Sequence, residues 1–128
     1  MFVRFVTQQI DEDSGRRQGL FAAAGELRES GRLSEVDEKT LDLAGKWFSE
    51  NLPVPDRLSV SRRPRRKAQA ISWFRDTSIE AISRIRAYAA VLEEYGVAVE
   101  MIHTDRPGFI VYEDEWQVAA YPFSDTMT

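Results

Sequence analysis

The stretch from Ala70 to Tyr121 constrains the fold most strongly, because a helical repeat lies there between segments that alternate like β-strands. Apolar side chains recur at helical spacing from Ile79 to Tyr95. Thr77 and Glu80 have the spacing of a capping box, in which a hydroxyl and a carboxylate each bond a free N–H group at the start of a helix. Gly96 follows the repeat in the position of a C-terminal cap. We therefore expect a capped helix over residues 79–95.

Strand-like segments surround this helix. An apolar segment at 69–75 precedes it, and three further segments follow at 97–104, 109–112 and 116–121. Their alternation of side chains is typical of strands in which one face is buried. The residues 105–108 have a proline second and a glycine fourth, as a type I turn prefers. The pattern predicts a strand, a helix and then a meander of three strands.

The N-terminal half predicts one strand and two helices. Residues 2–8 form an apolar strand pattern, and helical spacing appears at 17–30 and 35–50. Gly31 follows the first helical segment in the position of a C-cap, and Ser34 precedes the second in the position of an N-cap. Leu58 and Val60 then alternate with serines, which predicts a short strand. This strand would form a hairpin with residues 69–75.

Joined in order, these elements predict a single α+β domain over residues 1–128. We expect a mainly antiparallel sheet with helices on one face. The order β-α-α-β-β-α-β is a ferredoxin-like core with one additional helix, and the last two strands form a C-terminal β-hairpin extension. No repeat or linker divides the chain.

Composition restricts the class of protein. Hydrophobic residues make up 43% and charged residues 30% of the 128 residues, as in ordinary globular domains, and there is no cysteine. The chain therefore has no disulfides, zinc–thiolate sites or thiol nucleophiles. No apolar run approaches the length of a membrane span, and the N-terminal apolar run is too short for a signal peptide. We expect a cytoplasmic protein that has no membrane partner.

A basic run is the least ordinary feature of the sequence. It places five positive charges within six residues, and the remaining 12 basic and 21 acidic residues give the rest of the chain a net charge near −9. Guanidinium groups in such a run can contact the phosphates of a nucleic acid or nucleotide. The alternative is a solvated loop, or a loop that pairs with the acidic residues 11–13 or 113–115. The run consists of Arg62, Arg63, Arg65, Arg66 and Lys67.

The single histidine is the second candidate. His103 lies near the end of a predicted strand, and Asp105 could orient it as a general acid or base. No nucleophile pattern accompanies the pair, and there is no second histidine to complete a metal site. We therefore expect no metal site and no cofactor.

Aromatic residues of the strands are the third candidate. They could line a ligand site or an interface, although aromatics on strands usually belong to the core. If helices cover only one face of the sheet, its other face is free to pair with a second copy of the chain. The residues concerned are Trp73, Phe109, Tyr112 and Trp116.

Three functional hypotheses follow. The first is a non-enzymatic binding or accessory domain that self-associates through its sheet as a homodimer. The second is a protein that contacts phosphate, nucleic acid or another acidic partner through residues 62–67. The third is a small enzyme that uses His103 as a general acid or base.

Overall fold

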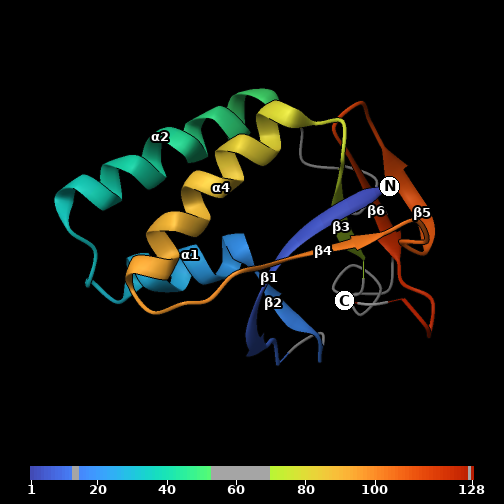
Figure 1. Cartoon of the computed structure of the whole chain (residues 1–128), viewed down its shortest axis with the longest axis horizontal. Helices are drawn as coiled ribbons and strands as arrows, with labels where there is room; N and C mark the ends of the chain where they lie inside the picture. The colour runs from blue at the N-terminus through green and yellow to red at the C-terminus, as the bar shows by residue number, and fades with distance from the viewer. Residues whose placement is uncertain (13–14, 53–69, 127) are drawn as a thin grey trace, which may run out of the picture.

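The computed structural model describes residues 1–12, 15–52, 70–126 and 128. These residues form an α+β fold with a six-stranded antiparallel sheet and three helices (Figure 1). The strands are β1 (Phe2–Ile10), β2 (Arg17–Gly19), β3 (Ile71–Arg75), β4 (Glu100–Thr104), β5 (Phe109–Glu113) and β6 (Gln117–Tyr121). The helices are α1 (Leu20–Glu29), α2 (Glu35–Asn51) and α4 (Ile79–Glu94).

The long strand β1 organises the sheet. Its residues 2–6 pair with β4, residues 2 and 3 also pair with β3, and residues 6 and 10 pair with β2. Because residues 2, 3 and 6 each have two partners, β4 occupies one edge of β1, and β2 and β3 share the other edge. From β3 the sheet continues to β6 and ends at β5.

All three helices pack on one face of the sheet. Val3, Phe5 and Phe74 face them and join a buried cluster built from α1, α2 and α4. Figure 1 shows the helices on one side and the β5–β6 hairpin on the far side of the molecule. The described helices therefore lie on the same face of the antiparallel sheet. Among the helices of the described residues, none is long and apolar enough to cross a bilayer.

The second face of the sheet is buried at its centre. Val6, Trp73 and Val118 are completely buried there and form a cluster with Ile71 and Ile102. Trp73 pairs directly with Val118 across β3 and β6, so alternate residues of the same strands face the two clusters. The centre of this face, which the sequence suggested was open, is buried.

Two local predictions are corrected. Residues 17–19 form the short strand β2 instead of the first turn of a helix, because they pair with β1. Helix α4 has Ser78 and not Thr77 as its N-cap, so the predicted capping box is wrong. The Ser78 hydroxyl caps no helix N–H group and instead donates a hydrogen bond to the backbone oxygen of Trp116 at 2.7 Å.

The strand order also differs from the predicted ferredoxin-like sheet. β6 lies beside β3, and β2 is added to the edge of β1. The reason is that the C-terminal hairpin contributes Val118, Ala119 and Ala120, which bury themselves completely at the edge of β3. The strand predicted around Leu58 and Val60 lies outside the described residues.

Candidate binding surface

The β5–β6 hairpin forms the outer part of the sheet, and Asp114 organises its turn. The carboxylate accepts hydrogen bonds from the Trp116 and Gln117 amides at 2.8 and 2.9 Å and from the Tyr112 hydroxyl at 2.7 Å. Partial burial raises the pKa of Asp114, but the hydrogen bonds from Tyr112, Trp116 and Gln117 outweigh this effect and hold the pKa below its ordinary value. The turn is therefore fixed by a charged acceptor.

Side chains from β3 and α2 hold the hairpin against the rest of the fold. Arg75 Nε donates to the Asp114 backbone oxygen at 2.9 Å, and its Nη2 pairs with Glu113 at 3.1 Å. On the helical side the Trp116 ring packs edge-on against Trp47 of α2, with 6.1 Å between ring centroids. The outer strand β5 is thus presented on a fixed support.

A close backbone contact sets the start of β5. Gly108 has a φ of 127°, and a Cβ atom there would collide with the backbone oxygen of Tyr121. This contact brings the segment after β6 beside the segment before β5. Arg106 lies over the Phe123 ring at 5.3 Å and pairs with Asp125 at 3.3 Å. The two segments form one surface.

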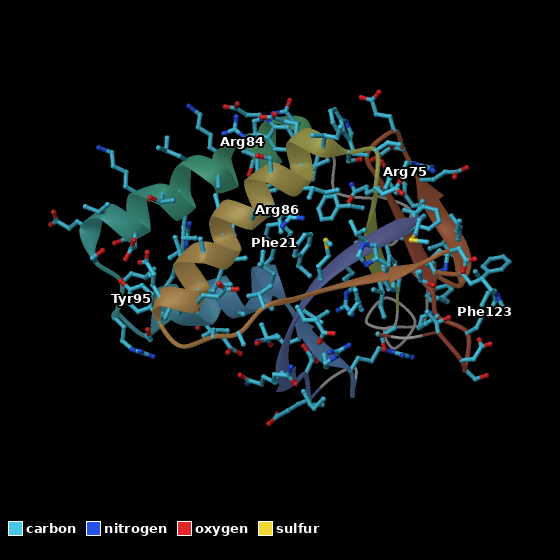
Figure 2. All side chains as sticks on the ribbon, viewed as in Figure 1. Phe21, Arg75, Arg84, Arg86, Tyr95 and Phe123 are labelled. Atoms are coloured by element: carbon cyan, nitrogen blue, oxygen red, sulfur yellow. The ribbon has the colours of Figure 1, made fainter. Side chains whose placement is uncertain are left out.

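Apolar side chains are exposed along this outer strand. Phe109 is 66% exposed and Ile110 is 40% exposed, and Phe123, on the segment after β6, is also 40% exposed. Figure 2 shows Phe123 at the margin of the molecule farthest from the helices. β5 pairs only with β6 within the described residues, so its other edge has no strand partner there. We call Phe109, Ile110 and Phe123 the β5 patch.

The four aromatic candidates separate into different environments. Trp73 is completely buried and belongs to the cluster on the second face of the sheet. Tyr112 and Trp116 are half-buried and support the hairpin turn. Phe109 alone of the four is fully available at the surface. The structure therefore keeps one aromatic of this set as a candidate for contact with a partner.

The histidine candidate lies apart from this surface. His103 pairs with Val3 in the ladder between β1 and β4, and its side chain is exposed. Asp105 follows β4 and is also exposed, and no hydrogen bond joins the two among the described residues. Within the same part of the chain, no group of three or more histidine, aspartate or glutamate residues is placed to hold a metal ion.

The basic run Arg62, Arg63, Arg65, Arg66 and Lys67 lies outside the described residues. Sequence reasoning missed Ile110 and Phe123 as surface residues. Ile110 belongs to a strand pattern that does not show whether its outer edge is paired, and Phe123 lies beyond the last predicted strand, which covers residues 116–121. The only sequence signal for Phe123 is an aromatic residue that follows the strand-ending Pro122.

A cavity of about 420 Å³ lies between α1, α2 and α4. Its lining includes the ring of Phe21 and the hydroxyl of Tyr88, and the ion pair of Arg28 with Asp42 lies at 2.9 Å. Figure 2 shows Phe21 between the helices. Tyr88 is 5% exposed, and burial, with a smaller contribution from Asp42, raises its pKa against the opposing effect of Arg28. The lining thus combines aromatic residues with an ion pair.

Comparison with known proteins gives no matching family model, no significantly similar curated protein and no significantly similar solved structure.

Proposed function

We propose that this chain is a small α+β interaction domain that self-associates through the outer edge of its sheet. The observation that carries the proposal is the exposure of Phe109 and Ile110 on β5, the terminal strand of the sheet. Sheet edges of soluble proteins are usually protected by charge, proline or a covering segment. β5 has one charged residue, Glu113, and no proline.

The arrangement of the β5 patch favours contact at the edge. Phe109 pairs with Tyr121 and Ile110 pairs with Ala120, so their side chains project from opposite faces of the sheet. A partner lying on one face would cover only one of them, whereas a partner that meets the edge can cover both. We therefore place the interface on the edge of β5 and not on the buried second face.

The charges beside the patch favour a second copy as the partner. Arg106 and Asp125 pair with each other beside Phe123, so these two charges balance at this part of the border of the patch. A two-fold axis at β5 would bring the same apolar side chains of two copies together. The β-bulge between Ile110 and Tyr112 limits a regular ladder, so we expect a reversible dimer.

Sedimentation velocity over a range of concentrations tests this proposal. The wild-type protein should move towards twice its monomer mass as its concentration rises, and the double variant F109S/I110S should remain monomeric. Leu43→Ser is the matched control, because Leu43 is 62% exposed on α2, away from the hairpin. This variant should associate like the wild type. A wild-type protein that is strictly monomeric at its highest soluble concentration contradicts the proposal.

Contact with phosphate or nucleic acid through residues 62–67 is a second proposal. It is supported by the concentration of five positive charges in a chain that is acidic elsewhere. Replacing the five residues with serine should abolish salt-dependent binding to a short nucleic acid, measured by fluorescence anisotropy. Acid–base catalysis by His103 stays a prediction, and its exposed position is compatible with contact to a substrate.

A further inference from the structure

Two glycines leave a gap between α1 and α2. Gly25 lies within α1 and Gly45 within α2, and both line the cavity of about 420 Å³ between the helices. Glycine inside a helix lowers the stability of the helix relative to alanine. A Cβ atom added to Gly25 would have no atom within 4 Å, so packing does not require a glycine there. The missing side chain at this position leaves space in the cavity instead.

Larger side chains join the helices on either side of the gap. Phe21 and Arg28 lie one helical turn before and one turn after Gly25, so all three are on one face of α1. The Arg28 guanidinium pairs with Asp42 of α2 at 2.9 Å. The Phe21 ring lies edge-on to Phe48 of α2, with 5.1 Å between ring centroids. These two contacts connect α1 and α2 on both sides of Gly25, and the cavity lies between them.

Tyr88 of α4 presents its hydroxyl group to the cavity. The residue is 5% exposed, and its hydroxyl oxygen lies 2.7 Å from the position that a Cβ atom of Gly45 would take. In the part of the chain that the structure describes, this hydroxyl makes no hydrogen bond, which is unfavourable for a buried polar group. Burial raises the pKa of Tyr88, so the hydroxyl keeps its proton at neutral pH and is a donor. An acceptor atom in the cavity would satisfy it.

Donors also predominate among the charged groups of the lining. Arg28 has further N–H groups besides the one that it gives to Asp42. Lys46 is exposed and pairs with Glu50 only at 3.8 Å. Among the described residues that line the cavity, Asp42 is the only carboxylate, and it is already paired with Arg28. A ligand with an anionic acceptor group therefore matches this lining better than a cation or a further donor.

We propose that this cavity binds a small planar aromatic carboxylate. The aromatic ring occupies the gap beside Gly25 and Gly45 and packs against Phe21, whose side chain is 45% exposed. The carboxylate accepts a hydrogen bond from the Tyr88 hydroxyl, and a hydrogen bond to a charged acceptor is stronger than one between neutral groups. The cavity volume also lies within the range of small-molecule sites, which is about 300–1,000 Å³.

Titration of the isotope-labelled full chain with benzoate, followed by its amide NMR signals at constant ionic strength, tests this proposal. The amide signals of Gly25 and Gly45 should shift and saturate, with a dissociation constant of about 1 mM or lower. Two further probes define the ligand class. Cyclohexanecarboxylate lacks the flat ring and benzamide lacks the charge, so each should bind at least about threefold more weakly than benzoate.

Three variants locate the bound probe. Gly25→Leu should abolish binding, because its side chain fills the open space of the cavity. Ala22→Leu is the matched control and should bind like the wild type, since Ala22 is exposed on α1 and does not line the cavity. Tyr88→Phe removes only the hydroxyl group and should weaken binding about tenfold. Thermal unfolding in the absence of benzoate establishes that each variant is folded.

The cavity is separate from the β5 patch and from residues 62–67, so the result does not depend on the proposed dimer. The proposal is overturned if benzoate does not bind the wild type, or if the affinity is unchanged in either Gly25→Leu or Tyr88→Phe. Loss of binding in Ala22→Leu, or equal affinities for benzoate and one of the two other probes, also overturns it. Should Gly25→Leu not fold, the affinity of Tyr88→Phe decides the matter.

Discussion

Tyr88 packs so closely against Gly45 that position 45 has no room for a larger side chain. A Cβ atom added to Gly45 would lie 2.7 Å from the Tyr88 hydroxyl oxygen. Tyr88 lies in edge-on contact with Phe21 and tilted contact with Phe48, so its ring has little room to move. None of the hydrogen bonds within the described residues involves the Tyr88 hydroxyl. This hydroxyl occupies the space that a side chain at position 45 would need.

Gly45→Ala should therefore destabilise the protein, although the same change in a helix interior normally stabilises it. We expect a loss of about 1–2 kcal/mol in the free energy of unfolding, because the alanine methyl group displaces the Tyr88 ring. In a Tyr88→Phe background the loss should disappear, since the colliding oxygen is gone. Urea denaturation of the four proteins of this cycle measures the coupling.

Gly25→Ala is the control for this cycle. Gly25 lies within α1 and would have no atom within 4 Å of an added Cβ. We expect the substitution to stabilise the protein by about 0.5–1 kcal/mol through its helix propensity. If Gly45→Ala gains stability as Gly25→Ala does, the Tyr88 ring moves aside without lowering the free energy of unfolding.

The surroundings of Arg4 and Trp73 could be predicted only in part from the sequence. A charged residue within the apolar run Phe2–Val6 was visible, but the run gives no information about which groups come to lie around it. Arg16 and Arg17 reach Arg4 only through the pairing of β1 with β2. Alternation placed Trp73 on a defined face of its strand, whereas its burial depends on strands that are distant in sequence.

At the scale of elements, local signals predicted the ends of helices well. Ser34 caps α2 by accepting a hydrogen bond from the Asp37 amide at 3.1 Å, and Gly31 and Gly96 adopt positive φ angles after their helices. These predictions succeeded because they concern residues a few positions apart. The capping box at Thr77 failed because the neighbouring Ser78 hydroxyl bonds to Trp116, a contact between distant segments.

The hairpin turn at Asp114 should make stability depend on pH. Its depressed pKa means that the ionised carboxylate stabilises the fold above the unfolded pKa of about 3.9. This contribution is lost as the pH falls through the lower folded pKa. Asp114→Asn should reduce the free energy of unfolding at neutral pH by about 1 kcal/mol, through weaker hydrogen bonds to Tyr112, Trp116 and Gln117. The difference from the wild type should narrow below pH 4.

Denaturation with urea at several pH values measures this effect. Glu115→Gln is the control, because Glu115 is exposed in the same turn and loses the same charge. It should show almost no change at neutral pH. Identical pH profiles for the two variants would mean that the hydrogen bonds to Asp114 contribute nothing to stability.

At the scale of the whole molecule, the two buried clusters share the same strands. Val3 and Phe5 face the helices while Val6 faces the second cluster, and Phe74 and Trp73 divide in the same way on β3. β1 and β3 contribute side chains to both clusters. If one cluster were disrupted, these strands would no longer be held in place to form the other. We therefore expect the described residues to unfold as one cooperative unit, as small single domains usually do.

We expect the two layers to unfold in one transition. In the variant W47F/W116F, Trp73 is the remaining tryptophan, so its fluorescence reports the second face while far-UV ellipticity reports the helices. Both signals should give the same Tm and the same van't Hoff enthalpy. Separate transitions would mean that the helical layer and the second cluster unfold independently.

The order of strands was the part of the fold that the sequence did not predict. Each strand segment was visible, apart from β2, which has three residues between a turn and a helix. β6 lies beside β3 because residues 117–120 pair with residues 71–74. The pairing of segments so far apart in the chain cannot be predicted from short-range sequence patterns. For the same reason, the patch on β5 became visible only when the terminal position of this strand was known.

The position of β1 has a consequence for the newly made chain. Phe2 pairs with Thr104, so β1 leaves the ribosome about 100 residues before its main partner does. At about 5–20 residues per second, the apolar N-terminal segment waits about 5–20 s for β4. During translation it is therefore a natural binding site for a chaperone, and a slower elongation rate lengthens the interval in which it can aggregate.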